Sequence, residues 1–163
     1  MNEIIEKYSK LLKVDFLKYF RLPDTFIRIN TLKIEPEKVV ENLQEKGYKL
    51  EKLKFFEYGF KVIDNGKNVA KEIEHVLGYI FVQDASSMLV PLVLDPKEDE
   101  IVLDLCAAPG AKTTEISQLM NNKGCIVAND VELKRIIALQ SNIQRMGCLN
   151  VIVIKEDGSF LCN

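Results

Sequence analysis

The sequence lacks several features that would assign it to a simple class. No run of apolar residues approaches the roughly 18 that a membrane-spanning helix needs. The N-terminal segment MNEIIEKYSKLLK mixes both charge signs and has no apolar stretch of the kind found in a signal peptide. The four cysteines (Cys106, Cys125, Cys148 and Cys162) form no CxxC pair. The chain is therefore expected to work in a reducing, cytoplasmic environment without disulfide bonds.

The sequence also contains few histidines and carries little net charge. The single histidine, His75, has no partner ligands at metal-binding spacing, so a surface or structural role is favoured over a metal site. A net charge of −2 gives no overall basic signature of nucleic-acid binding. A neutral total still permits RNA binding through one local face, although solvated helix faces are the simpler interpretation of the charge clusters. With 47% hydrophobic residues the chain can bury a core, which excludes a disordered protein.

The first half of the chain has a pattern typical of a ferredoxin-like α+β domain. Apolar residues at helical spacing predict an amphipathic helix within residues 3–20, and alternation predicts a strand at Thr25–Leu32. The elements that follow are a helix from Pro36 to Leu43 ended by Gly47, strands at 48–53 and 58–63, a helix at 69–77 closed by Gly78, and a strand at 79–82. The order after the first helix is therefore β-α-β-β-α-β, and a further helix is expected from Ala85 to Leu94.

The second half predicts a parallel sheet of Rossmann-like α/β type. Nearly all-apolar strands at 101–105, 125–128 and 151–154 alternate with helices at 113–120 and 133–146. This pattern indicates strands that are covered on both faces. We therefore divide the chain into an N-terminal domain, residues 1–95, and the first half of a doubly wound domain, residues 96–163. In that fold the first strand has two neighbours, but this sequence supplies only one, so we expect a truncated chain whose open edge favours self-association or a partner chain.

The segment Asp104-Leu-Cys-Ala-Ala-Pro-Gly-Ala-Lys-Thr113 joins the first of these parallel strands to its helix. Its small residues let a ligand approach the backbone, and the helix N-terminus behind them offers free N–H groups to an anionic group. Asp130 follows the second strand, where an acidic residue typically binds ribose hydroxyls, and Asp157 follows the third. Together these residues predict a cofactor of adenosine type that lies across the strand ends.

Each of these residues also has a purely structural interpretation. Asp130 and the pair Asp157-Gly158 are of types common in turns, and Cys106 is of a size suited to burial. Lys112 could be a solvated lysine, but a cation in the first helical turn opposes the helix dipole, which favours a ligand role. Two other cofactor-binding motifs do not match this loop. A phosphate-binding P-loop needs glycine at the two positions that Cys106 and Ala111 occupy. A nicotinamide-binding motif needs three glycines, and this loop has one.

The same loop resembles the cofactor loop of the Sun/Nop-type RNA (cytosine-5) methyltransferases, which use S-adenosyl-L-methionine. That family usually has a second glycine at the position of Ala111 and an arginine at that of Ser159. Arg28–Leu32 and Gln83–Ser87 are similar to segments that precede its catalytic domain. The resemblance implies these cofactor-binding residues: Cys106, Ala107, Ala108, Pro109, Gly110, Ala111, Lys112, Asp130, Arg135 and Asp157.

The resemblance further implies an RNA partner, tRNA or rRNA, and a cysteine thiolate that attacks carbon 6 of cytosine. The cysteines of that family lie in Asp-Ala-Pro-Cys and Thr-Cys motifs, and neither motif occurs in this sequence. No catalytic residue is therefore assigned. The family nucleophile is expected beyond Asn163, and this chain alone is expected to be inactive.

The alternative is a non-catalytic RNA-binding or assembly module that retains the cofactor pocket. Several aromatic residues of the N-terminal domain could stack on bases, although core packing is the simpler role for most of them: Phe55, Phe56, Tyr58 and Phe60.

Overall fold

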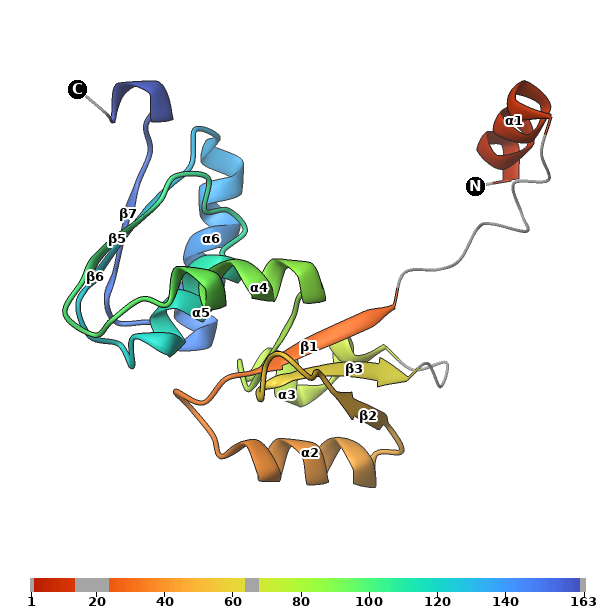
Figure 1. Ribbon diagram of the computed structural model, residues 1–163, viewed down its shortest axis with the longest axis horizontal. Helices are drawn as coiled ribbons and strands as arrows, with labels where there is room; N and C mark the ends of the chain where they lie inside the picture. The colour runs from red at the N-terminus through yellow and green to blue at the C-terminus, as the bar shows by residue number, and fades with distance from the viewer. Residues whose placement is uncertain (1, 14–23, 64–67, 162–163) are drawn as a thin grey trace.

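A computed structural model describes residues 2–13, 24–63 and 68–161 of the chain (Figure 1). Within these residues the chain forms two β-sheets, one from each half of the sequence. The first sheet is antiparallel with strand order β2-β3-β1-β4, and its strands are β1 (Thr25–Ile29), β2 (Lys49–Lys52), β3 (Gly59–Ile63) and β4 (Ile80–Val82). This order and these directions confirm the predicted ferredoxin-like arrangement. We call residues 24–82 the N-terminal unit and residues 101–161 the C-terminal unit.

Helix α2 (Pro36–Glu45) lies along one face of the first sheet (Figure 1). It begins where the sequence predicts, because a first helical turn does not need the N–H group that Pro36 lacks. Its residues Val39 and Leu43 are fully buried and share one apolar cluster with Ile27 and Ile80 of the sheet. This contact between helix and sheet is the core of the N-terminal unit.

The single helix predicted at residues 69–77 is two short pieces in the structure. They are the 3-10 helix η2 (Val69–Lys71) and the α-helix α3 (Ile73–Val76). Glu72 between them has an extended backbone, with ψ of 154°. Its carboxylate accepts a hydrogen bond from the Tyr48 hydroxyl at 2.8 Å and lies 3.2 Å from Lys46 Nζ. These contacts with the residues after α2 hold Glu72 outside helical geometry, and no local sequence pattern indicates them.

The second sheet is parallel, with strand order β5-β6-β7. It consists of β5 (Ile101–Asp104), β6 (Cys125–Asn129) and β7 (Val151–Ile154), which are connected by α5 (Ala111–Leu119) and α6 (Leu133–Met146). All five elements lie within two residues of their predicted ranges. The Rossmann-like half-domain predicted from the sequence is therefore confirmed.

Only one face of this second sheet is covered by helices within the described part of the chain. Helices α5 and α6 lie on the face that buries Val102 and Ile126 (Figure 1). On the opposite face Ile101 is 80% exposed, Leu103 50% and Ile152 55%. The prediction that helices cover both faces of the sheet is thus confirmed for one face. No described element covers the other, apolar face or the free edge of β5.

The two units meet through buried polar contacts. Asn30 Nδ2 donates hydrogen bonds to the carbonyl oxygens of Gly78 and Met146, both at 2.8 Å. Gly78 has a φ of +73°, and a Cβ atom at this position would lie 1.9 Å from the carbonyl oxygen of Arg145. Both the left-handed backbone and the close carbonyl therefore require glycine. Helix α4 (Ala85–Leu94) continues from β4 and packs against α5.

The first predicted helix falls partly outside the described residues. Helix α1 spans Asn2–Leu12, which confirms the first part of the helix predicted within 3–20, whereas residues 14–20, Phe16 among them, are not described. In the ranges that the structure covers, no helix is both long and apolar enough to cross a bilayer.

The last two residues of the sequence also lie outside the described ranges. Cys106, Cys125 and Cys148 are free thiols, whereas Cys162 and Asn163 are not described. The expected position of the catalytic nucleophile, beyond Asn163, is therefore not tested by the structure and stays a prediction.

Candidate functional site

The carboxyl ends of β5, β6 and β7 meet at one edge of the second sheet, as parallel neighbours require. A cavity of about 350 Å³ lies at this edge. Its lining includes Cys106 after β5, Asp130 after β6 and Asp157 after β7, together with Arg135 of α6. The structure therefore brings together four predicted site residues from three separate segments of the sequence.

The loop after β5 turns tightly before α5 begins. Ala107 N donates to Asn129 O at 2.8 Å, Gly110 N donates to Ala107 O at 2.7 Å, and the Ala108–Pro109 peptide bond is cis. Gly110 has a φ of +104°, and a Cβ atom there would lie 2.9 Å from Leu139 Cδ1. Glycine at this position lets the loop pack closely on α6. The N–H groups of the first turn of α5 point toward this loop, as those at any helix start do.

Asp130 and Arg135 both form hydrogen bonds with the backbone of Ala108 in the loop. The Asp130 side chain is only 1% exposed, and its Oδ2 accepts a hydrogen bond from Ala108 N at 3.3 Å. Arg135 Nη2 donates to Ala108 O at 2.7 Å, and Nη1 lies 3.4 Å from Asp130 Oδ2. The other oxygen, Oδ1, accepts from Glu132 N at 3.1 Å. A carboxylate has about four acceptor sites, so Asp130 retains capacity for a ligand after fixing the loop.

Asp157 is exposed and begins the short 3-10 helix η3 (Gly158–Phe160). Its Oδ1 accepts hydrogen bonds from Ser159 N at 2.9 Å and from Ser159 Oγ at 2.8 Å. The backbone N–H of Ser159 is the main cause that lowers the pKa of Asp157 below its ordinary value, and the hydroxyl adds to it. Asp157 is therefore a fixed anion in the cavity lining.

Asn129 is a site residue that the sequence reasoning missed. Its Nδ2 donates to Leu105 O and to Glu156 O, both at 3.0 Å, and its Oδ1 accepts from Glu156 N at 2.9 Å. The side chain thus ties the segments after β5 and β7 to the end of β6, which sets the shape of the cavity. The available signal was a polar residue at the end of an apolar strand, directly before Asp130.

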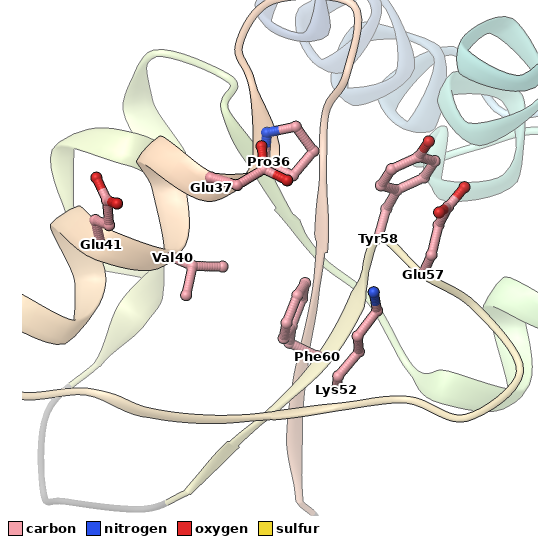
Figure 2. A pocket seen from close by; sticks show the side chains of 8 residues that line it. All are labelled: Pro36, Glu37, Val40, Glu41, Lys52, Glu57, Tyr58 and Phe60. Carbon is pink, nitrogen blue, oxygen red and sulfur yellow. The ribbon is translucent and has the colours of Figure 1, made fainter.

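A second cavity, of about 320 Å³, lies between α2 and strands β2 and β3 in the N-terminal unit (Figure 2). Its lining consists of Pro36, Glu37, Val40, Glu41, Lys52, Glu57, Tyr58 and Phe60. Three carboxylates against one lysine disfavour an RNA phosphate. Phe56 and Phe60 are buried, which confirms core packing for these two of the four aromatic residues, whereas Phe55 is 44% exposed. Base stacking by Phe55 and Tyr58 stays a prediction.

His75 lies at the contact between the two units. Its carbonyl oxygen accepts a hydrogen bond from Arg145 Nη1 at 2.6 Å. Burial is the main cause that lowers the pKa of its imidazole, and the Arg145 charge lowers it further. Among the described residues, no group of three His, Cys, Asp or Glu side chains is placed to hold a metal ion.

Two family models match the chain, one over each half of the sequence. Residues 2–85 match the N-terminal domain of 16S rRNA methyltransferase RsmF, and residues 91–162 match 16S rRNA methyltransferase RsmB/F. The chain belongs to this methyltransferase family. The assignment confirms the predicted membership in the Sun/Nop-type methyltransferases and, at the level of the family, the predicted cofactor S-adenosyl-L-methionine.

Individual relatives of this chain are named for different RNAs. A tRNA (cytosine(49)-C(5))-methyltransferase of Pyrococcus abyssi is 42% identical over 98% of this chain and 52% of its own length. A ribosomal RNA small subunit methyltransferase F of Shewanella woodyi is 40% identical over 88% of this chain and 31% of its own length. The crystal structure of a methyltransferase homolog from Pyrococcus horikoshii has a TM-score of 0.82 and 37% identity, covering 87% of this chain and 47% of that one. The chain thus spans about a third to a half of these relatives.

The other predicted cofactor residues, 107–112, do not line the cavity. They form the rest of the loop and the first two residues of α5. Ala107 and Ala108 are buried in an apolar cluster with Leu139, so their side chains shape the loop rather than the cavity wall. Lys112 lies in a separate hollow of about 540 Å³ between α4 and β5, whose lining is mainly apolar. Contacts of these loop residues with the cofactor stay a prediction.

Proposed function

We propose that this chain is the part of an S-adenosyl-L-methionine-dependent RNA (cytosine-5) methyltransferase that binds the methyl donor and orients the RNA, either tRNA or rRNA. The observation that carries the proposal is the meeting of Cys106, at the start of the small-residue loop, with Asp130 and Asp157 at one cavity. The printed names of the relatives, a tRNA cytosine methyltransferase and rRNA methyltransferases, support the substrate class.

The proposal divides the chain into two functional parts. Residues 1–95 orient the RNA, and residues 96–163 form the first half of the cofactor-binding domain. The two separate sheets support this division, as do the family models, the first of which ends at residue 85 and the second of which begins at residue 91. Helix α4 lies between the two sheets in sequence and packs against α5, so it links the parts.

The residues at the cavity fit the proposed cofactor chemically. Asp130 has acceptor capacity left for ribose hydroxyls, and the fixed anion Asp157 suits the adenine side of the site. The loop Cys106–Lys112 lets the cofactor approach the backbone at the N-terminus of α5, where a carboxylate is favoured. When bound, S-adenosyl-L-methionine supplies an electrophilic methyl group. The chain's own residues bind and orient it.

Methyl transfer to carbon 5 of cytosine needs a cysteine thiolate placed at the base. Cys148 is buried, and burial raises the pKa of its thiol, which disfavours a nucleophilic role. Cys125 begins β6, at the opposite end of that strand from the cavity. Cys106 lines the cavity, but neither it nor any other cysteine of the sequence stands in an Asp-Ala-Pro-Cys or Thr-Cys motif. On the absence of these motifs we propose that the catalytic cysteines lie in polypeptide beyond Asn163, and that the 163-residue chain by itself transfers no methyl group.

A second candidate function, a non-catalytic assembly module, rests on the open side of the second sheet. Among the described residues β5 pairs only with β6, and the apolar side chains of Ile101 and Leu103 are exposed. Such an edge favours pairing with a further strand. We propose that further polypeptide, from the same protein or from a partner, covers this edge and face.

Calorimetric titration of the chain with S-adenosyl-L-methionine tests the proposal. Asp130→Ala should weaken binding by about 1–3 kcal/mol, because the ribose hydroxyls of the bound cofactor are left without their acceptor. The matched control is Glu132→Ala, which removes the neighbouring exposed carboxylate and should leave the affinity unchanged. A wild-type chain that takes up ATP but not S-adenosyl-L-methionine would reject the methyl-donor site. Radiolabel transfer from the cofactor to RNA by this chain alone would reject the proposed position of the catalytic cysteines.

A further inference from the structure

Arg28 is a fully buried arginine that reaches from the N-terminal unit into the C-terminal unit. It lies on β1, the strand between β3 and β4, and its side chain has no exposed surface. Its Nη2 donates to Thr114 Oγ1 at 2.8 Å, and its Nη1 donates to Gln118 Oε1. Both acceptors are on α5, the helix that begins directly after the cofactor loop. Its Nε donates to Gln83 Oε1 at 3.2 Å, just beyond β4.

Within α5 the contact continues to Ala111, the first residue of the helix, which directly follows the loop. Thr114 Oγ1, which accepts the bond from Arg28, donates its own hydrogen to Ala111 O at 3.2 Å. A chain of two hydrogen bonds therefore runs from the Arg28 guanidinium through the Thr114 hydroxyl to the backbone of Ala111. A parallel tie holds the helix to β1, because Gln118 Nε2 donates to Ile29 O at 3.1 Å.

Phe81 adds an apolar contact from the same sheet. It lies opposite Arg28 in the register of β1 and β4 and shares a buried cluster with Ala107 and Ala108 of the loop. The guanidinium carbon of Arg28 is 5.7 Å from the centre of the Phe81 ring, and that of Arg145 is 5.2 Å from it. The back of the cofactor loop is thus packed against the N-terminal sheet.

A contribution to stability alone does not explain why an arginine is buried at position 28. Its nearest carboxylate oxygen, Glu115 Oε2, is 3.9 Å from Arg28 Nε, so the pair has no close hydrogen-bonded contact. Desolvation of a buried pair offsets much of its Coulombic gain, and an apolar pair can serve packing as well. What a guanidinium supplies is a rigid planar fork whose several N–H groups fix the directions of several acceptors at once.

We propose that Arg28 is a positioning residue for the cofactor loop. Through Thr114 it holds the first turn of α5, where the loop ends, and Phe81 packs beside it against the loop, so the N-terminal unit is a structural part of the cofactor site as well as a guide for RNA. This inference rests on the proposed function, in which that loop binds S-adenosyl-L-methionine.

Variants of Thr114 test the hydrogen-bond chain without removing the buried charge. Thr114→Val is close in shape and lacks the hydroxyl, whereas Thr114→Ser keeps it. We expect Thr114→Val to weaken S-adenosyl-L-methionine binding by about threefold to tenfold, the loss of a net hydrogen bond. Thr114→Ser should stay close to the wild type. Arg28→Lys, which lacks the fork, should weaken binding at least as much as Thr114→Val.

A second measurement does not depend on the cofactor. Amide hydrogen exchange of the peptide that covers residues 105–112 should be faster in Thr114→Val and Arg28→Lys than in the wild type and in Thr114→Ser. The control is Lys61→Gln, which removes an exposed ion pair with Asp24 in the N-terminal unit, away from α5. It should change neither binding nor exchange in the loop.

The outcomes separate this inference from the proposed function. Unchanged affinity and loop exchange in Thr114→Val would overturn the positioning role. Equal effects of Thr114→Val and Thr114→Ser would also overturn it, because the hydroxyl would then not matter. If the wild type bound no S-adenosyl-L-methionine while loop exchange responded as expected, the positioning role would stand and the proposed function would fail.

Discussion

Glu115 should make the stability of this protein depend on pH near neutrality. Its carboxylate is fully buried on α5, where Oε2 accepts a hydrogen bond from Gln83 Nε2 at 2.6 Å. The other oxygen, Oε1, has no hydrogen-bond partner among the residues that the structure describes. Burial raises the pKa of Glu115 from 4.5 to about 7, although the charges of Arg28 and Lys112 and the Gln83 bond oppose the rise. Arg28 in turn faces Cys148 and Arg145 of the C-terminal unit.

The direction of the effect follows from which state binds the proton. The unfolded chain releases the Glu115 proton near pH 4.5, whereas the folded chain holds it until about pH 7. Between these values the folded state binds more protons, so the free energy of unfolding falls as pH rises. The stabilisation is fully present below pH 4.5 and is lost above pH 7. At about 1.4 kcal/mol for each pH unit, the full interval corresponds to roughly 3 kcal/mol.

The variant Glu115→Gln isolates this contribution, because a neutral amide mimics the protonated acid at every pH. Urea unfolding of both proteins, followed by circular dichroism at pH 5, 6, 7 and 8, gives their free energies of unfolding. From pH 5 to pH 8 the wild type should lose about 2–3 kcal/mol relative to Glu115→Gln. The matched control Glu41→Gln removes an exposed carboxylate of α2 and should differ from the wild type by a constant amount.

A difference between wild type and Glu115→Gln that does not change with pH would refute the reasoning. Glu115 would then be ionised throughout, and its attraction to Arg28 would outweigh the cost of burial. Changes in the absolute stability of both proteins at low pH are expected from other carboxylates and cancel in the difference.

Two further predictions concern packing and the open sheet edge. Gly78→Ala should lower the free energy of unfolding by at least about 2 kcal/mol, because it adds a collision with Arg145 O to an unfavourable backbone conformation. The control is Gly47→Ala, at a position that also has a positive φ, and urea unfolding should show a smaller loss of stability for it. Equal losses in the two variants would show that the collision with Arg145 O does not matter. We expect the wild-type chain to self-associate through β5, which light scattering would detect. Leu103→Lys places a charge at a half-exposed position of this edge strand and should reduce the association. A monodisperse wild-type monomer would contradict this prediction.

The sequence by itself determined the order of elements and the position of the candidate site. Strand and helix periodicities are local, so the strands of both sheets could be predicted from neighbouring residues alone. Parallel strands place their carboxyl ends at one edge, and this rule was enough to expect the loop after β5 beside Asp130 and Asp157. The membership of the family followed from the same loop, whose residues are contiguous in the chain.

Only the tertiary structure decided the features that depend on residues distant in sequence. Glu72 interrupts a predicted helix because Tyr48 and Lys46 hold its carboxylate. Asn129 became a site residue because two other strand ends lie within reach of its amide.

Arg28 is the clearest example of a residue whose surroundings the sequence pattern does not predict. In an alternating strand pattern it occupies a polar position that would ordinarily face solvent. The structure buries it instead, because α5 supplies acceptors 86 and 90 residues away, at Thr114 and Gln118. Periodicity predicts which face of an element is apolar, but it contains no information about which other element covers the remaining face. That pairing is decided by packing across the whole chain, and here it joins the N-terminal sheet to the cofactor loop.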